Sequence, residues 1–521
     1  MNPSRAPELT ARWQEHLGRV PWWRLFRVGA WAAAAVQVLL VATVVARRVG
    51  YPYELEWMEG GMVEHVRRFL VGEPLYVVPS LEFVSYLYPP LYYVVSAPLA
   101  SALGVDFLAL RITSLVATLG CAALVYHLAA RPDTTDGKPD REAGAVAAVL
   151  FLGAYFAGGA WYDLARVDML FLALLLGTVA AARRRTRGGY ALAGVLLGLA
   201  VLTKQPALVA GFPLLAYALG VDRWRAWPFV AGALLVGGGG LGALHLASGG
   251  WSTFYIFTMP AGHPLVPSSF VLFVLSDLFD PMPVGVCLAA AAVVAAVRRS
   301  DAFWLAVVVG VGASSFLARV HEGGFVNVLI PLYAVGAVLA GRGLTVFRGA
   351  AERMGAGRPA ALALLYGALL VQFFGLPEDP KQQVPTPEDR AAGARLEARL
   401  AALPRPAYIA SDGYLAVRAG HPRQADLLAV WDVTRSDTGA GRRLRAAFEA
   451  AYAGRRFARV VVPQGYEGVI ALPPGYRRVE DLAVTAYDAS DAFERLTGAP
   501  GRSRYVYAPP EAAGPSPRGR R

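Results

Sequence analysis

Three glutamates follow the first apolar segment of the chain within a few residues. Glu54, Glu56 and Glu59 lie in the sequence YELEWMEGG, shortly after an apolar run that ends near residue 46. A carboxylate can accept the proton of an attacking hydroxyl group, and general-base catalysis of this kind contributes roughly 10²–10⁴-fold to a rate. We predict that Glu56 or Glu59 is such a base and that Glu54 contacts substrate. A solvated acidic turn is the alternative without a catalytic role.

A second group of polar side chains occurs at the ends of apolar segments or in the external loops and turns between them. An ionisable residue at membrane depth costs at least a few kcal/mol, so such residues indicate a site when they gather on one side of a bundle. Guanidinium and ammonium groups suit a phosphate or diphosphate, and they stabilise it as it departs. The predicted substrate-binding residues of this group are Arg111, Arg166, Asp168, Lys204, His263, His321 and Asn327. Together with the glutamates, they indicate sugar transfer from a lipid-phosphate donor.

The composition places the chain among membrane proteins. Hydrophobic residues make up 55% of its 521 residues and charged residues 17%, which differs strongly from a soluble domain. The net charge of +12 comes mostly from arginines in short loops between apolar segments. This is the positive-inside pattern and needs no nucleic-acid partner. Both cysteines, Cys121 and Cys287, fall in apolar segments, so neither a disulfide nor a zinc site is indicated.

The spacing of the arginine loops predicts the topology. Taking the basic loops as cytoplasmic gives an all-α polytopic protein with about eleven transmembrane helices, in which 1–376 is the membrane module and 47–107 the first external loop. The count closes only if the segment from Pro89 to Leu103, which is short for a span, lies at the membrane surface as a juxtamembrane helix. Arg47 and Arg48 are the local exception to the charge rule, either facing lipid phosphates or outweighed by the other loops.

The last third of the chain has a different composition. A proline-rich linker at 377–387 leads to a helical segment at 388–402, a short strand at 407–411, a helix near 441–453 and a strand at 459–462. This alternation predicts a small α/β domain at 388–510 on the external side. Residues 511–521 are expected to be a disordered tail.

The order of these features resembles a known family. It consists of the acidic loop, a glycine thirteen residues after Glu59, the sequence YPPLYY from Tyr88, LRITS from Leu110, and GVLLGLAVLTKQ ending in Lys204 and Gln205. Over about residues 20–345 the chain is similar to bacterial members of the dolichyl-phosphate-mannose protein mannosyltransferase family, of the glycosyltransferase C-type fold, which also includes the lipid A aminoarabinose transferases. The resemblance implies a base in the first external loop, a juxtamembrane helix at the Pro-Pro segment, and a donor phosphate supported by Arg111.

One position departs from the family. Met58 stands where the family has its catalytic aspartate, while Glu59 matches the glutamate that follows it, so the choice between Glu56 and Glu59 stays open.

The expected protein is an inverting glycosyltransferase of the bacterial inner (plasma) membrane. It uses a polyprenyl-phosphate sugar, a lipid, glycan or protein acceptor, and no nucleic acid. We predict no cofactor and no metal ligands. A divalent metal is the alternative, although His321 and Glu322 are adjacent and do not share a helix face. Two further functions fit the same composition: a transporter or flippase of lipid-linked substrates, and a non-catalytic external scaffold.

Overall fold

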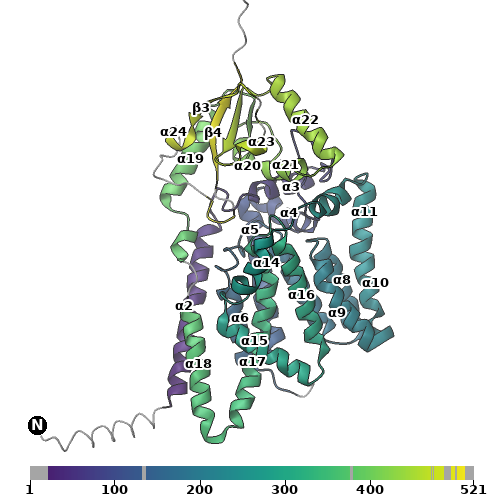
Figure 1. Cartoon of the computed structure of the whole chain (residues 1–521), viewed down its shortest axis with the longest axis vertical. Coiled ribbons are helices and arrows are strands. Elements are labelled where there is room, and N and C mark those ends of the chain that lie inside the picture. Colours follow the sequence, from purple (N-terminus) through teal and green to yellow (C-terminus); the bar gives the residue numbers. More distant parts are fainter. Residues whose placement is uncertain are drawn as a thin grey trace, which may run out of the picture.

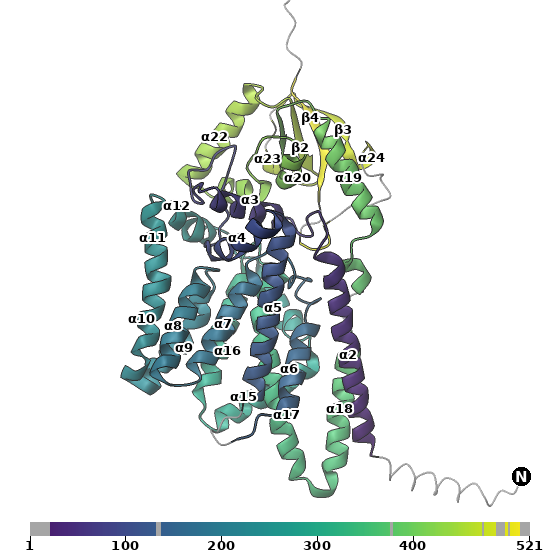
Figure 2. The same ribbon diagram turned by 180° about the vertical axis from the view of Figure 1, so that it is seen from behind.

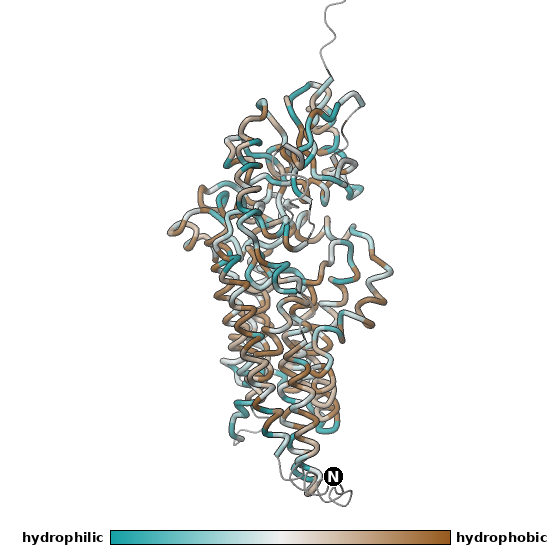
Figure 3. The backbone as a smooth tube through the Cα atoms, turned by 90° about the vertical axis from the view of Figure 1, so that its left-hand side faces the viewer, coloured by the Kyte–Doolittle hydropathy of each residue, from teal (hydrophilic) through white to brown (hydrophobic). Residues whose placement is uncertain are grey.

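The chain folds into a bundle of apolar helices beneath a smaller α/β unit (Figure 1). This computed structural model describes residues 21–131, 137–375, 379–470, 472, 474–485, 495–498 and 501–510. Hydrophobic residues predominate along the bundle, whereas hydrophilic residues are frequent in the unit above it (Figure 3). The expected disordered tail at 511–521 and part of the expected linker at 377–387 lie outside the described residues.

The bundle is built from apolar helices that the sequence predicts closely. Within the described residues, six segments are long and apolar enough to cross a membrane, and shorter apolar helices pack among them. One segment, Ala207–Ala247, has 41 residues, or roughly 60 Å of helix at 1.5 Å per residue. That is about twice the bilayer core, and the helix breaks at Arg223, whose φ is 46°. The segment thus corresponds to two of the predicted spans, and the total of about eleven crossings remains a prediction. The helices are α2 (Trp22–Arg48), α5 (Phe107–Ala130), α6 (Arg141–Gly153), α7 (Asp168–Ala182), α8 (Arg187–Val201), α9 (Ala207–Asp222), α10 (Trp227–Ala233), α11 (Gly239–Ala247), α15 (Pro283–Arg298), α16 (Ala302–Val320), α17 (Ile330–Glu352) and α18 (Arg358–Phe374).

Short helices cover the end of the bundle that faces the α/β unit. Helices α3 (Glu59–Leu70) and α4 (Leu91–Leu103) form the first long loop, and both lie between the bundle and the unit (Figure 2). Three short helices, α12 (Trp251–Thr253), α13 (Met259–Ala261) and α14 (Pro267–Leu272), follow α11. Helix α4 starts directly after Pro90 and stops at Gly104, whose φ is 100°, so turn residues limit it to 13 residues. It is therefore too short to cross a bilayer.

The C-terminal unit contains a mixed sheet. Among the described residues the strands are β1 (Ala407–Ile409), β2 (Arg459–Pro463), β3 (Arg477–Asp481) and β4 (Ser503–Ala508), in the spatial order β1-β2-β4-β3. Strand β1 runs parallel to β2, and the other pairs are antiparallel. The helices are α19 (Pro387–Ala401), α20 (Gly413–Arg418), α21 (Leu427–Thr434), α22 (Gly439–Ala453), α23 (Glu467–Ile470) and α24 (Leu482–Thr485). The predicted helices and strands of this region are present, but its independence as a domain remains a prediction.

The arginine loops lie at the far end of the bundle from the α/β unit. The loops that follow α9 and α17 are at that end in both ribbon views, as is the start of α2 (Figures 1 and 2), and Figure 2 shows the same for the loop after α7. Arg48, at the end of α2, lies at the opposite end but is fully buried, and its Nε is 3.0 Å from Oδ2 of Asp163. One of the two exceptions to the charge rule, Arg48, is thus neutralised in a buried pair. The expectation that Arg48 faces lipid phosphates is wrong.

Candidate functional site

The largest cavity near the predicted site residues has a volume of about 640 Å³ and lies where the bundle meets the α/β unit. Its wall combines aromatic and aliphatic side chains with a few polar groups, which is typical of small-molecule sites. Val209 of α9 and Leu317 of α16 line it and are 36% and 51% exposed on the bundle surface. The cavity, called the main cavity below, therefore reaches the lipid-facing surface. Its polar lining residues include Glu56, Arg166, Lys204, Gln205, His263, His321, Asn327, Asp432 and Arg435.

Glu56 and Arg166 form the centre of this wall. Nη1 of Arg166 donates to both carboxylate oxygens of Glu56 at 3.0 Å, and Nη2 donates to the hydroxyl of Tyr88 at 2.8 Å. Glu56 also accepts a hydrogen bond from the backbone N–H of Met58. Burial raises the pKa of Glu56 to about 7, although Arg166 and the Met58 N–H act in the opposite direction. A carboxylate with this pKa can both accept and release a proton near neutral pH.

Arg166 lies in a non-helical segment that is buried within the helix bundle. Residues 154–167 form turns between α6 and α7, and nearly all are buried. Irregular backbone at this depth is tolerated where it is enclosed by protein or lines a polar cavity. The turn segment meets both conditions, since Trp161 and Arg166 line the main cavity. Arg166 could be predicted from the sequence because its charge interrupts an apolar stretch.

Lys204 is held by a carboxylate at the start of α7. Its Nζ lies 2.6 Å from Oδ1 of Asp168, which also accepts a hydrogen bond of 2.9 Å from the amide of Asn327. Trp161 donates to the other oxygen, Oδ2, at 3.2 Å. Asp168 itself does not line the main cavity. It positions two residues that do, Lys204 and Asn327, and these three predicted residues therefore form one cluster.

Glu59 and Arg111 form an anchor outside the main cavity. Both are fully buried, and Nε and Nη2 of Arg111 donate to Glu59 at 2.9 and 2.6 Å. The backbone N–H groups of Leu55 and Ala165 complete the carboxylate's partners. These donors outweigh burial and lower the pKa of Glu59. Both carboxylate oxygens of Glu59 thus accept hydrogen bonds from protein groups. The other donors of Arg111 bond to the backbone carbonyls of Arg48, Tyr51 and Tyr53 in the first loop. The structure thus does not bring Arg111 into the main cavity.

Glu54 ties the first loop to the C-terminal unit. Arg495 donates to its Oε2 at 3.0 and 2.7 Å and also contacts Asp412 at 3.1 Å. All three side chains are buried. Burial raises the pKa of Glu54 to about 8, against the effect of Arg495. The alternative of a solvated acidic turn is wrong, because Glu54, Glu56 and Glu59 each have a different buried arginine partner.

The rim of the main cavity includes residues that the sequence analysis missed. Asp432 of α21 and Arg435, which directly follows this helix, line it beside His263 and His321, whose rings are 5.1 Å apart. Nε2 of His263 is 3.5 Å from Oδ1 of Asp432. Burial lowers the pKa of His263 to about 3 and raises that of Asp432 to about 7. Asp432 could have been found from the sequence, because its charge interrupts the apolar run LLAVWDVT.

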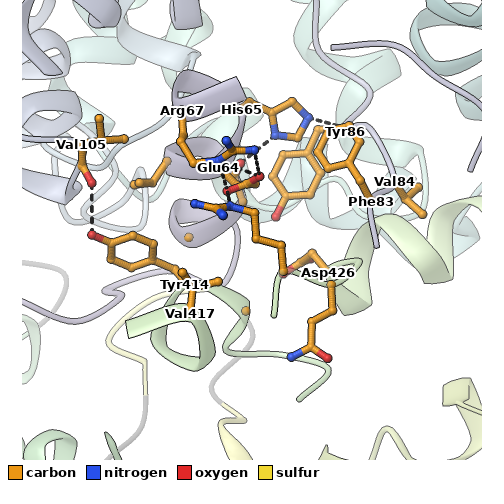
Figure 4. Close-up of a pocket in the computed structure, with 16 residues that line it drawn as sticks. Glu64, His65, Arg67, Phe83, Val84, Tyr86, Val105, Tyr414, Val417 and Asp426 are labelled. Atoms are coloured by element: carbon orange, nitrogen blue, oxygen red, sulfur yellow. Dashed lines mark hydrogen bonds and ion pairs between the residues drawn. The ribbon is translucent and has the colours of Figure 1, made fainter. Parts of the chain in front are cut away.

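A separate cavity of about 230 Å³ lies between α3 and the C-terminal unit (Figure 4). It shares none of its lining residues with the main cavity. Glu64 pairs there with Arg67 of the same helix and with Arg423 of the C-terminal unit, at 2.7 and 3.1 Å. Tyr414 of α20 donates to the carbonyl of Val105. Figure 4 thus shows one part of the contact between the first loop and the C-terminal unit.

Metal-ligating side chains are scattered in the described part of the chain. No group of three or more His, Cys, Asp or Glu side chains within it is arranged to hold a metal ion. The imidazole Nε2 of His321 is within 2.9 Å of the carbonyl of Pro260.

Comparison with known proteins identifies the fold. Residues 88–248 match the sequence model of the dolichyl-phosphate-mannose-protein mannosyltransferase family. The structure is similar to that of ArnT from Cupriavidus metallidurans bound to undecaprenyl phosphate, with a TM-score of 0.55 and 14% identity over 91% of this chain and 97% of that one. The chain has the glycosyltransferase C-type fold. The resemblance found in the sequence is thereby confirmed, and the chain is an integral membrane protein of this fold.

Other comparisons agree on the fold. The apo structure of the same ArnT gives a TM-score of 0.54 over the same shares of the two chains. The archaeal oligosaccharyltransferase AglB from Archaeoglobus fulgidus, in complex with an inhibitory peptide and a dolichol-phosphate, gives 0.53 at 11% identity, over 85% of this chain and 70% of that one. A comparison with curated protein sequences gives no match. The family match and the fold together support a membrane glycosyltransferase.

Proposed function

We propose that the chain is an inverting glycosyltransferase of the bacterial inner membrane that moves a sugar from a polyprenyl-phosphate donor to a cell-envelope acceptor. The main cavity carries this proposal, because it joins a lipid-facing apolar opening to the buried carboxylate of Glu56 and to the cations of Arg166 and Lys204. The relatives add support: one ArnT structure holds undecaprenyl phosphate, and an AglB structure holds dolichol-phosphate. The predicted external, periplasmic side of the α/β unit would let an acceptor reach the cavity from outside the cell.

The donor phosphate is proposed to bind near Lys204. An ammonium group within a largely enclosed site stabilises the negative charge that grows on a departing phosphate. Arg166 can serve the same phosphate when Glu56 takes up a proton, since the guanidinium then loses the charge of its nearer partner and keeps only the more distant Asp168, at 4.0 Å. The prenyl chain would lie along the apolar opening beside Val209 and Leu317. In this arrangement Lys204 and Arg166, rather than Arg111, support the phosphate.

Glu56 is the proposed base. The acceptor hydroxyl would attack the anomeric carbon from the face opposite the phosphate and form the new C–O bond. Its proton passes to Glu56 while the bond from the anomeric carbon to the phosphate oxygen breaks and polyprenyl phosphate leaves. One displacement inverts the configuration at that carbon. Glu59 fits the role less well, because its carboxylate is saturated by Arg111 and two backbone N–H groups.

The test uses purified protein in lipid nanodiscs with a panel of polyprenyl-phosphate hexoses and pentoses. Release of polyprenyl phosphate and transfer to envelope glycolipids, glycans or peptides are measured separately by mass spectrometry. The proposal predicts consumption of at least one donor and formation of a product of inverted configuration. Movement of a lipid-linked sugar across the bilayer without donor consumption would replace it with the flippase function.

A further inference from the structure

A groove of about 310 Å³ lies within the C-terminal unit. It is bounded by β1, α21, α22 and α23, and it is called the α21–α22 groove below. Four of its lining residues are aromatic, namely Tyr408, Trp431, Phe448 and Tyr452. Its volume is at the lower end of the range typical of ligand pockets.

The groove adjoins the main cavity. Trp431 and Arg435 line both spaces and so form a shared wall. The guanidinium carbon of Arg435 lies 3.9 Å from the centroid of the Trp431 ring. Nη1 and Nη2 of Arg435 also contact Glu322 at 2.7 Å and Asp432 at 3.0 Å. A molecule that reaches over this wall would touch both the proposed catalytic cavity and the groove.

The groove is lined by a tyrosine whose hydroxyl has unused hydrogen-bonding capacity. Tyr452 is 2% exposed, and its hydroxyl has no hydrogen-bond partner among the residues that the structure describes. Buried polar atoms are almost always satisfied, so an unsatisfied one requires an explanation such as a bound ligand. Arg445 and Glu449 line the same groove from α22, where their charged groups can reach the hydroxyls of a bound molecule.

This combination fits a sugar ring. A pyranose presents an apolar face of C–H groups, which packs on aromatic rings, and an edge of hydroxyls that bond to phenol, guanidinium and carboxylate groups. We propose that the acceptor is a glycan or a glycolipid, and that a sugar ring beside the acceptor hydroxyl binds in the α21–α22 groove. This inference rests on the proposed function, whose acceptor it narrows to a carbohydrate.

Gly468 allows a direct test. A Cβ added at Gly468, which lines the groove, meets no atom within 4 Å, so Gly468→Leu fills the space without displacing backbone. The matched control is Gly439→Leu, at an exposed position of α22 whose added Cβ has only the tip of Arg443 nearby, at 3.4 Å. Tyr452→Phe removes the unpaired hydroxyl alone. Arg445→Ala, at a half-buried position, is a second variant in case Gly468→Leu does not fold.

Binding is measured first, without any donor. Saturation-transfer NMR is recorded on the full protein in nanodiscs with methyl glycosides of hexoses, pentoses and N-acetylhexosamines. We expect at least one glycoside to bind, its signal to vanish in Gly468→Leu and to persist in Gly439→Leu, and its affinity to fall by about tenfold in Tyr452→Phe. No glycoside binding to the wild-type protein, or binding that survives both Gly468→Leu and Arg445→Ala, would overturn the inference.

Activity then separates the two proposals. With a donor that the enzyme consumes, Gly468→Leu should raise the KM for a glycan acceptor at least tenfold and leave the donor KM and donor hydrolysis unchanged. Efficient transfer to a peptide that is insensitive to Gly468→Leu argues against a carbohydrate acceptor. If the wild-type protein consumes no polyprenyl-phosphate sugar, the proposed function fails, whereas the glycoside measurement still decides the groove.

Discussion

Arg166 donates through one nitrogen to both carboxylate oxygens of Glu56, although 110 residues separate them in the chain. The pair lines the main cavity, whereas the equally buried pair of Arg111 and Glu59 does not. Two glutamates that are three residues apart therefore have different environments. Glu56 faces the space where a substrate can bind, and Glu59 joins α3, α5 and the loop before α7.

Substitution of the two glutamates should separate catalysis from folding. Glu56→Gln should lower turnover by on the order of a hundredfold or more, because loss of a general base typically costs about two to four decades. Glu59→Gln should instead lower stability by roughly 3–5 kcal/mol, because it leaves the buried charge of Arg111 without its partner. Turnover and thermal unfolding in detergent are measured for both. Full activity in Glu56→Gln, with activity abolished at unchanged stability in Glu59→Gln, would reverse the assignment.

The pH dependence follows from the raised pKa of Glu56, about 7. A base acts in its ionised form, so kcat/KM should rise about tenfold per pH unit below pH 7 and level off above it. The effect of pH on the free energy of unfolding has the opposite sign. The folded state binds the proton of Glu56 more tightly than the unfolded chain does, where the pKa of this glutamate is 4.5. The contribution of Glu56 to stability is thus fully present below pH 4.5 and is lost as the pH rises through 7. We expect the rise of kcat/KM below pH 7 to be absent from Glu56→Gln when rates are measured from pH 5 to 9. A rise that persists in this variant would show that another group titrates.

Lys204→Gln should weaken donor binding. A hydrogen bond to a charged group contributes about 1.5–3 kcal/mol, so the donor KM should rise roughly 10- to 100-fold. Arg184→Gln is the control, an exposed cation at the opposite end of the bundle. Both variants are compared by donor titration at fixed acceptor concentration. Thermal unfolding is measured as a check, because Asp168 loses the nearer of its two ion partners in Lys204→Gln and keeps Arg166 at 4.0 Å. An unchanged donor KM in Lys204→Gln would show that the phosphate binds elsewhere.

The buried pair of Arg48 and Asp163 can be tested by comparing the stability of single and double variants. Arg48→Met leaves a buried carboxylate without its partner and should cost about 3–5 kcal/mol, while the double variant Arg48→Met/Asp163→Leu should recover much of this loss. The adjacent Arg47 is exposed, so Arg47→Met should have little effect. Apparent midpoints of thermal unfolding in detergent give the comparison. Equal effects of the Arg47 and Arg48 substitutions would contradict the pairing.

The proposed orientation can be tested with single cysteines in a background that carries Cys287→Ala. A cysteine at Gly439 should react with an impermeant maleimide in intact spheroplasts, because the C-terminal unit is expected outside the cell. A cysteine at Arg184 should react only after the membrane is opened. Both positions are exposed on the protein, so labelling depends only on the side of the membrane that the reagent can reach. The opposite pattern would place the main cavity on the cytoplasmic side.

The sequence alone determined the membrane class, the positions of the apolar helices and the elements of the α/β unit that carry local patterns. It also located the acidic loop and Arg166, Asp168, Lys204, His263, His321 and Asn327 as residues of one region. These conclusions rest on hydropathy, periodicity and charge, which are properties of neighbouring residues. For the same reason, the strands β3 and β4 and the short helices after α11 were not predicted, since their segments are brief and lack strong patterns.

Only the tertiary structure decided which charges lie in a cavity and which are anchors. Glu54, Glu56 and Glu59 are alike in sequence, but their partners come from positions 495, 166 and 111. It likewise paired Arg48 with Asp163 and brought Asp432 of α21, with Arg435 directly after this helix, to the rim of the main cavity. Such pairings join segments tens to hundreds of residues apart, and local sequence patterns do not contain them. The energetic reason is the same in each case, because a buried charge is stable only beside an opposite charge or hydrogen-bond donors, wherever the fold supplies them.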